Sequence, residues 1–285
     1  MIKYIYNMKR AFKSGVLFPN ADYPKEAPFG STETPVKASF LRRLKYEKDW
    51  FRISRHRLST ADIETPLSIL HITDVHLRTP DLWLKKLCEA MMGLSPDIVA
   101  LTGDIVAPGW KEEAFDLFMK ALPKGRLGRF AVMGNWDIWA TNQPEKWLQR
   151  YKKHNVELLI NSWKPAGEWC IAGVDDLLAG KPTPQQLIKT LPSKPTLMLN
   201  HCPALFRQLA VDPIRLVLSG HAHGGQVRLP LIGPLWTPKG SGKTVAGWSK
   251  RNDTHLFVSR GVGWSVAPIR ILCPPELAWI DISPE

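Results

Sequence analysis

The sequence predicts an α/β protein built as a four-layer sandwich, in which helices flank two mixed β-sheets. Short apolar runs alternate with amphipathic segments over much of the chain after residue 46, which is typical of strands separated by helices. After His223 the helical spacing stops, and only strand-like runs remain. Early alternation followed by late strands fits two packed sheets with helices outside them.

The individual elements follow from the same pattern. Apolar or alternating runs bounded by turn residues predict strands over residues 50–58, 67–73, 98–102, 127–133, 168–173, 196–200, 216–219, 226–229, 255–260 and 277–282. Amphipathic spacing predicts helices over residues 82–92, 112–121, 144–154 and 203–210. Prolines and glycines in residues 15–38 indicate an extended linker. We therefore expect a basic N-terminal extension and linker over residues 1–45 and one folded domain over residues 46–285.

The composition is that of an ordinary globular protein, with 44% hydrophobic and 22% charged residues. The 4 cysteines are widely separated and form no C-x-x-C pair, which favours a reduced, cytosolic compartment. No apolar run approaches the roughly 18 residues of a spanning helix. The first residues are too broken by charge for a signal peptide. We therefore expect a cytoplasmic protein whose contact with a membrane, if it has one, is peripheral.

The net charge of +12 is concentrated near the N-terminus, where residues 1–60 hold 13 Lys/Arg and 5 Asp/Glu, a balance of 13 − 5 = +8. Residues 40–46 and 50–52 interleave basic with apolar and aromatic side chains. Such a segment can lie on the anionic inner face of a membrane, where each basic residue adds about 1 kcal/mol. Two alternatives stay open: a solvated tail that keeps the protein soluble, and, less favoured, a surface that binds nucleic acid.

Side chains that bind metals follow five predicted strands at the points where the strands end. They are Asp74, His76, Asp104, Asn135, His201, His221 and His223. A two-metal hydrolytic site needs ligands from several rigid strands, because its ions lie only about 3.5–4 Å apart. A mixed Asp, Asn and His set without thiolates suits Mn, Fe, Mg or Zn. The sequence therefore predicts a dinuclear metal centre.

Each short motif also has a structural interpretation. Asp74 and His76 alone could be an Asp-capped turn beside a surface histidine, and Asp104 alone could cap a helix. The run from Gly220 to Gly225 is the most specific, because two imidazoles one residue apart between glycines have little reason to exist in a core. The presence of all the motifs together favours metal binding.

In chain order the motifs read D-x-H, G-D, G-N-x-D, H and G-H-x-H, and they resemble the calcineurin-like metallophosphoesterases. The resemblance runs from about Tyr46 to Ile282, so it implies a catalytic domain over residues 46–285 with the fold of that family. It implies two divalent ions, with Mn favoured, and hydrolysis of a phosphoric ester or pyrophosphate. It also assigns the catalytic ligands: Asp74, His76 and His223 to the first ion, Asn135, His201 and His221 to the second, and Asp104 as the bridge.

Several segments near the C-terminus narrow the resemblance. Residues 226–230, 258–263, 268–270 and 274–276 are similar to a branch of bacterial membrane-associated phosphoesterases. Some members of this branch cleave UDP-2,3-diacylglucosamine to UMP and an acylated sugar phosphate during lipid A synthesis. The alternatives are a general phosphodiesterase or phosphatase for phospholipids, nucleotides or phosphoproteins, and a non-catalytic scaffold. The filling of all seven ligand positions argues against a scaffold.

The third motif departs from the family. Gly134-Asn135-Trp136-Asp137 has tryptophan where the family usually has the histidine that protonates the leaving oxygen. An indole N–H can donate a hydrogen bond but does not give up its proton. This favours a substrate with a weakly basic leaving group, unless a donor such as His154 takes over. We expect Arg78, Trp136 and Asp137 to contact the substrate. Further tryptophans near the motifs can line a pocket for an acyl chain or nucleobase, but such residues are more often part of the core.

Overall fold

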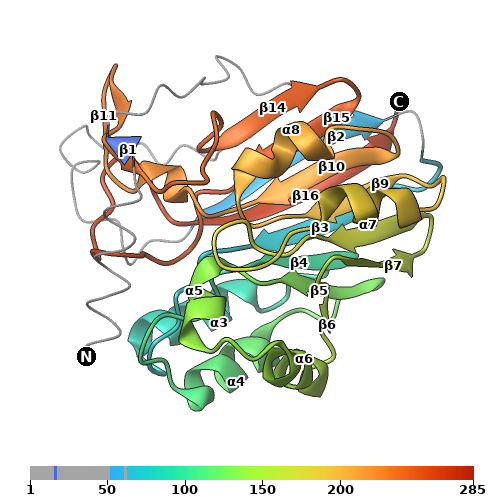
Figure 1. Ribbon diagram of the computed structural model, residues 1–285. Helices are drawn as coiled ribbons and strands as arrows, with labels where there is room; N and C mark the ends of the chain where they lie inside the picture. Colours follow the sequence, from blue (N-terminus) through green and yellow to red (C-terminus); the bar gives the residue numbers. More distant parts are fainter. Residues whose placement is uncertain (1–15, 18–51, 61–62) are drawn as a thin grey trace.

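The computed structural model describes residues 16–17, 52–60 and 63–285 and contains two mixed sheets of six strands each (Figure 1). The first sheet has the order β2 (Arg52–Thr60), β16 (Glu276–Pro284), β3 (Leu67–Ile72), β4 (Ile98–Thr102), β5 (Gly128–Val132) and β6 (Glu157–Leu158). The second has the order β14 (Gly247–Arg251), β15 (Thr254–Val258), β10 (Ile214–Ser219), β9 (Thr196–Leu199), β8 (Trp169–Gly173) and β7 (Ser162–Ala166). The predicted fold class is confirmed.

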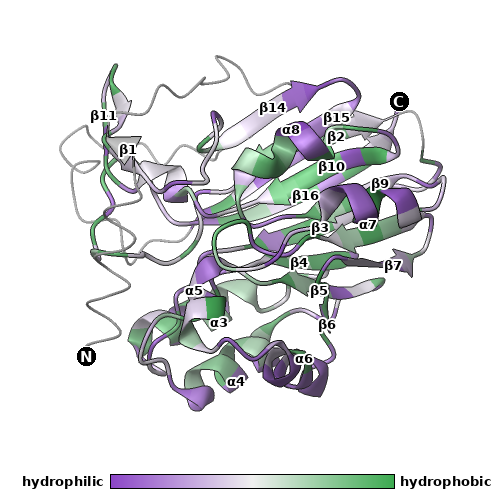
Figure 2. Cartoon of the chain, viewed as in Figure 1, coloured by the Kyte–Doolittle hydropathy of each residue, from purple (hydrophilic) through white to green (hydrophobic). Residues whose placement is uncertain are grey.

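Helices cover the outer face of each sheet. The first sheet carries α3 (Leu82–Met91), α4 (Glu112–Ala121) and α6 (Pro144–Lys153), and the second carries α7 (Pro184–Thr190), η1 (Pro203–Leu205) and α8 (Phe206–Leu209). Three buried apolar clusters result: one between each sheet and its helices, and one between the two sheets. Figure 2 shows the hydrophobic strands inside and hydrophilic surfaces on α6 and α7.

The central strands are apolar throughout because both of their faces are buried. In β4, Val99 and Leu101 pack toward the helices, whereas Ile98 and Ala100 pack toward the second sheet. A strand buried on both faces shows a continuous apolar run instead of an alternating one. The sequence pattern predicted these strands correctly, to within one or two residues at their ends.

Several elements differ from the prediction. Helix α5 (Asn135–Ala140) was missed, since Gly134-Asn135 resembles a turn, and the predicted helix over 203–210 divides into η1 and α8. The strand expected over 226–229 is shorter, and a 3-10 turn, η2 (His223–Gly225), precedes it. Helix α7 and several short strands at sheet edges and in hairpins were also missed; among them are β6, β7, β12 (Gly233–Pro234), β13 (Trp236–Thr237) and β14.

The N-terminal extension is described at one point only. Strand β1 (Val16–Leu17) pairs in antiparallel fashion with β13, so the predicted linker touches the domain there. The remainder of residues 1–45 lies outside the described residues, and so do the interleaved basic and aromatic residues of 40–46 and the first residues of 50–52. Within the described part of the chain, no helix has the length and apolar character needed to cross a membrane.

The ligand loops meet because of the strand directions. β3, β4 and β5 are parallel neighbours in the first sheet, and β9 and β10 are parallel neighbours in the second. The carboxyl ends of parallel strands open at one edge of a sheet, which is where α/β proteins place their ligands. The two stacked sheets therefore bring five loops to one end of the sandwich.

Candidate metal centre

Loops from both sheets are joined at the centre by backbone hydrogen bonds. The N–H of Asp74 donates to the carbonyl of Gly103 at 3.0 Å, and the N–H of His76 donates to the carbonyl of Asp104 at 3.0 Å. The N–H of His221, from the other sheet, donates to both carboxylate oxygens of Asp74, at 3.1 and 2.9 Å. These bonds fix the positions of the loops without using the metal-binding atoms of the imidazoles.

The ligand loops have unusual backbone conformations. Five of the seven predicted ligands have positive φ angles of 51–67°: Asp74, His76, Asp104, His221 and His223. This region is uncommon for residues other than glycine, and strained residues cluster at functional sites. Gly134 and Gly220 have no room for a side chain, since a Cβ atom would collide with Asp104 at the first and with Thr73 and Asp74 at the second.

One cluster of ligand atoms comes from Asp74, His76 and His223. Nε2 of His223 lies 3.1 Å from Nε2 of His76 and 3.3 Å from Oδ1 of Asp74. The three side chains are buried, and their ligand atoms all lie within 4.8 Å of one another. This is the set that the resemblance assigns to the first ion.

A second cluster adjoins the first through Asp104. Oδ2 of Asp104 lies 3.3 Å from Nε2 of His201 and 3.8 Å from Nε2 of His76. Nε2 of His201 lies 3.2 Å from Nδ1 of His221. One oxygen of Asp104 therefore faces both clusters, as a bridging carboxylate requires.

The donor atoms fit divalent cations. Nδ1 of His201 donates to the carbonyl of Thr102 at 2.7 Å, so its Nε2 keeps a lone pair for a metal. Nε2 of His221 donates to the carbonyl of Lys239 at 2.8 Å, so its Nδ1 is the free nitrogen. Oδ1 of Asn135 is buried and has no hydrogen-bond partner in the described part of the chain. Backbone carbonyls that fix the tautomer of an imidazole are typical of metal sites.

Burial and charge shift the pKa values within the centre. Burial lowers the pKa of His76 to about 3 and that of His221 to about 4, so both imidazoles are neutral, as ligands must be. Burial raises the pKa of Asp74 to about 7. Burial also opposes the charge on His201, but the neighbouring carboxylates, chiefly Asp104, together outweigh burial and raise the pKa of His201 to about 10. A cation that binds here would therefore displace protons from Asp74 and His201.

Comparison with known proteins decides the family, because residues 67–225 match the family model described as calcineurin-like phosphoesterase. The chain is a calcineurin-like phosphoesterase. The matched region contains all seven predicted ligands. Membership of the family makes this phosphoesterase a metal-dependent phosphoester hydrolase, and the clusters above are the candidate positions for its ions.

Relatives of this phosphoesterase are found in several organisms. It is 30% identical over 247 residues to phosphodiesterase YaeI of Escherichia coli, covering 83% of this chain and 90% of the relative. It is 28% identical over 195 residues to the uncharacterized metallophosphoesterase YkuE of Bacillus subtilis, covering 64% and 66%. It is 29% identical over 236 residues to a transmembrane protein with metallophosphoesterase domain of Danio rerio, covering 74% and 52%.

A narrow cleft opens over the phosphoesterase's ligands. Besides Asp104, Asn135, His221 and His223, it is lined by Trp136, Trp139, Leu178, Trp236, Pro238 and Ser265. The edge of the Trp136 ring meets the ring of His76 with centroids 5.7 Å apart, and Trp139 meets Trp136 in the same way at 5.5 Å. Trp136 therefore lies in the cleft, and its contact with the substrate stays a prediction. Sequence reasoning missed Trp236, Pro238 and Ser265, since nothing near them in the chain carries a metal motif.

Arg78 lies behind the first cluster. Its Nη1 donates to the carbonyl of His76 at 3.2 Å, and its guanidinium stacks on Trp264 at 5.2 Å from the ring centroid. The charge of Arg78 contributes to the low pKa of His76. Arg78 therefore lies beside the centre, and its contact with the substrate stays a prediction.

Asp137 does not occupy the position that the sequence analysis gave it. Its side chain is fully buried; Oδ1 accepts from the N–H of Val106 at 3.0 Å and Oδ2 from the N–H of Gly134 at 2.9 Å. Asp137 is the third residue of α5 and caps the start of that helix. Both oxygens are thus engaged with the backbone, and Asp137 joins the second and third motifs instead of facing the cleft.

His154 is not placed to act as a proton donor. It lies at the C-terminal end of α6, where its Nε2 contacts Oδ1 of Asp116 on α4 at 2.7 Å and its ring packs on Phe115. The alternative donor named in the sequence analysis is therefore a link between two outer helices. Trp110 and Trp147 are also core residues there, stacked with centroids 5.6 Å apart.

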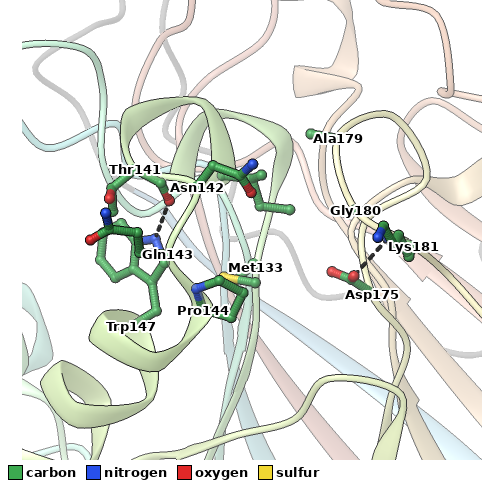
Figure 3. A pocket seen from close by; sticks show the side chains of 11 residues that line it. Met133, Thr141, Asn142, Gln143, Pro144, Trp147, Asp175, Ala179, Gly180 and Lys181 are labelled. Carbon is green, nitrogen blue, oxygen red and sulfur yellow. Dashed lines mark hydrogen bonds between the residues drawn. The ribbon is translucent and has the colours of Figure 1, made fainter.

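A second pocket of about 280 Å³ lies beside the cleft (Figure 3). One wall consists of Thr141, Asn142, Gln143, Pro144 and Trp147, and the opposite wall of Asp175, Ala179, Gly180 and Lys181. Leu178 lines the metal cleft, and the next two residues line this pocket, so a single loop separates the two. Its position offers room for a part of a substrate away from the reacting phosphate.

Proposed function

We propose that this phosphoesterase hydrolyses a phosphodiester or pyrophosphate bond in a lipid-linked substrate at a membrane surface, with two divalent ions. The finest form of the proposal is the cleavage of UDP-2,3-diacylglucosamine to UMP and an acylated sugar phosphate, a step in lipid A synthesis. The observation that carries it is an indole in the cleft where the family usually has a proton-donating histidine, above a full set of seven ligands.

In such a reaction the protein's residues would hold the ions and orient the phosphoryl group. Divalent ions at these ligands would polarise the phosphoryl group and lower the pKa of water toward about 7. The Thr102 and Lys239 carbonyls keep the metal-binding nitrogens of His201 and His221 free. Arg78 adds a positive charge beside the first cluster, which favours an anionic phosphoryl group.

The leaving group must depart with little help. Among the described residues that line the cleft, the only carboxylate and imidazoles are metal ligands. Trp136 can stabilise the leaving oxygen by a hydrogen bond but cannot protonate it. A phosphate expelled from a pyrophosphate is a weak base and needs little protonation, whereas an alkoxide needs much. The cleft chemistry therefore supports a pyrophosphate or an activated diester.

The surroundings of the cleft support a substrate with an aromatic or apolar portion. Trp139 and Trp236 line the cleft, and their rings can stack on a uracil or pack on an acyl chain. The second pocket next to Leu178 could take the remaining part. A nucleotide-linked lipid has both portions on either side of a pyrophosphate, which is why we favour it.

The direct test is a comparison of substrates with purified, Mn-loaded protein. Release of UMP from UDP-2,3-diacylglucosamine should exceed hydrolysis of an alkyl phosphomonoester by orders of magnitude in kcat/KM, and Asp104→Ala should abolish it. A preference for the alkyl monoester would overturn the leaving-group argument. Loss of all hydrolysis in the wild-type protein, with both ions bound, would favour the scaffold.

A second candidate is a general phosphodiesterase for phospholipids or nucleotides. It is favoured by the name of the Escherichia coli relative, which describes a phosphodiesterase without a stated substrate. A panel of phospholipids and an aryl phosphodiester in the same assay separates the two. Comparable kcat/KM values for aryl diesters and UDP-2,3-diacylglucosamine would select the general enzyme.

For its location we propose the cytoplasm, with peripheral contact at the inner face of the membrane through the basic N-terminal region. The +8 balance of residues 1–60 and the pairing of β1 with the domain support this arrangement. Nucleic acid is the less favoured partner, since the cleft is narrow and lined by metal ligands and apolar side chains.

A further inference from the structure

An exposed apolar hairpin stands beside the metal cleft. Strands β11 (Arg228–Leu229) and β12 form this hairpin, and the loop containing Ile269 lies against its base. Four aliphatic side chains are exposed here, with exposed fractions of 38, 109, 57 and 39%: Leu229, Leu231, Ile232 and Ile269. We call these four residues the apolar tip; the end of the hairpin is green in Figure 2.

Folding gives no reason for a leucine at the end of the hairpin. Leu231 has a φ of +66°, in the region that favours glycine, and its side chain is fully exposed. A bulky side chain in this conformation costs energy, and here no packing within the domain offsets that cost. Exposed aliphatic groups that gather beside a functional site are typical of an interaction surface.

The hairpin is continuous with the wall of the cleft. At its start, Gln226 directly follows η2, which contains the ligand His223, and Oε1 of Gln226 accepts from the N–H of Ser265 at 2.9 Å. At its end the chain runs into Trp236 and Pro238, which line the cleft. Whatever the apolar tip contacts is therefore held next to the entrance of the metal centre.

Basic residues accompany the hairpin. Arg228 lies in β11, and Lys239 and Lys243 follow within ten residues after β12. From residue 213 to residue 252 the sequence has no acidic residue. Apolar side chains among basic residues match the chemistry of an anionic lipid surface, with charged headgroups above hydrocarbon.

We propose that the apolar tip inserts into the interface of an anionic lipid bilayer and holds the cleft entrance against the membrane surface. Pairing of β1 with β13 brings Val16 and Leu17 of the N-terminal extension to the same part of the domain, because β13 directly follows the hairpin. The two contacts differ in kind: the extension contributes charge, and the tip contributes hydrocarbon. The membrane contact rests on the tip's own chemistry; only its use in presenting a lipid-linked substrate rests on the proposed function.

The test measures binding of the full chain to phosphatidylcholine vesicles with and without 30% phosphatidylglycerol, in low salt and in 1 M NaCl. Leu231→Ser/Ile232→Ser should weaken the partition onto anionic vesicles by about tenfold or more at both salt concentrations, because apolar insertion is not screened by salt. The matched control is Met92→Ser/Leu148→Ser, which removes two apolar side chains, 75% exposed just after α3 and 44% exposed on α6. The control should bind as the wild type does.

A probe at the tip provides a second measurement. An environment-sensitive dye on Leu231→Cys should shift to shorter emission wavelengths when anionic vesicles are added, whereas the same dye on Met92→Cys should not. Equal binding by wild type and the tip variant, or a dye at 231 that stays in water, overturns the proposal. A dimer of the wild type that the tip variant abolishes overturns it too, since the tip would then bind a second copy. None of these measurements depends on turnover, so a failed substrate assay leaves their result unaffected.

Discussion

The backbone N–H of Trp136 donates a 2.8 Å hydrogen bond to Oδ1 of Asp104, the carboxylate whose other oxygen faces both ligand clusters. The residue that departs from the family pattern thus helps to orient the bridging ligand through its backbone. Because any residue can supply that N–H, the side chain at position 136 can change without loss of the bridge. The indole therefore affects the cleft and its substrate, and the ligand set does not depend on it.

Trp136→His tests the role of the indole in catalysis. The new imidazole can protonate a leaving oxygen, so kcat/KM for alkyl phosphomonoesters should rise relative to that for pyrophosphates, by up to about 10²-fold. Asp137 is not available to orient this imidazole, because both of its oxygens accept from backbone N–H groups, so the gain in kcat/KM should fall well short of about 10²-fold.

The control for that variant is Trp136→Phe, which removes the indole N–H without adding a proton donor. Kinetics of UDP-2,3-diacylglucosamine, an aryl phosphodiester and an alkyl monoester should be compared across the three proteins. An unchanged ratio of alkyl monoester to pyrophosphate hydrolysis in Trp136→His would show that leaving-group protonation does not limit this enzyme.

Asp104→Ala should lose both ions and all activity, because Oδ2 of Asp104 lies 3.8 Å from His76 in the first cluster and 3.3 Å from His201 in the second. Elemental analysis should find two ions per chain in the wild type and fewer than one in the variant. Asp116→Ala is the matched control, since Asp116 is a carboxylate that pairs with Lys153 and His154 between outer helices. Wild-type stoichiometry in Asp104→Ala would remove Asp104 from the ligand set.

Asp137→Ala should destabilise the protein and affect activity only through the loops. Two buried backbone N–H groups, of Val106 and Gly134, would lose their acceptor, at a cost of about 1–3 kcal/mol each. Urea unfolding should rank wild type above Asp137→Asn and Asp137→Ala last, because the amide keeps one acceptor oxygen. A raised KM at unchanged stability would instead restore the original prediction that Asp137 contacts substrate.

Metal affinity should fall as the pH is lowered. The pKa of Asp74 is raised to about 7, chiefly by burial, and the pKa of His201 is raised to about 10 by its neighbouring carboxylates, chiefly Asp104, against the effect of burial. An ion must displace the His201 proton below about pH 10 and the Asp74 proton below about pH 7. As the pH is raised from 7 to 10, the apparent Kd for the ion should therefore fall by roughly tenfold per pH unit. Below pH 7 it should change more steeply with pH.

Calorimetry with Mn in two buffers of different ionisation enthalpy measures the protons released at each pH. The experiment should find close to one proton released per chain at pH 8 and a larger number at pH 6. Proton release near zero at both values would contradict the assignment of Asp74 and His201 as ligands.

Deletion of residues 1–45 should weaken the binding of anionic vesicles mainly at low salt. Exposed charges are screened over about 8 Å at physiological ionic strength, so the contribution of this basic segment should shrink as salt is added. Flotation of the intact and shortened proteins with neutral and anionic liposomes measures it. Equal binding of both proteins to both kinds of liposome would remove the N-terminal region from the membrane contact.

The sequence by itself determined the fold class and most of the central strands, and it predicted seven ligands. Strands such as β4 are apolar on both faces, so their pattern does not depend on knowing the partner sheet. These ligands could be predicted because they follow the strands directly and because the order of the motifs along the chain is specific to the family. Short edge strands such as β7, which contains Lys164 and Pro165, carry no such pattern and were missed.

Only the tertiary structure decided which side chains around the ligands face the cleft. Asp137 is next to Trp136 in the chain, but successive side chains of a helix point in different directions. In α5, Asp137 therefore contacts the backbone of Val106 and Gly134, whereas Trp136 lines the cleft. Trp236 and Ser265 reach the cleft from segments far from the third motif, and the exposure of Leu231 depends on a hairpin that the sequence did not predict. Strand and ligand patterns are local and repeat along the chain, whereas the direction of a loop side chain depends on contacts between segments that the sequence does not bring together.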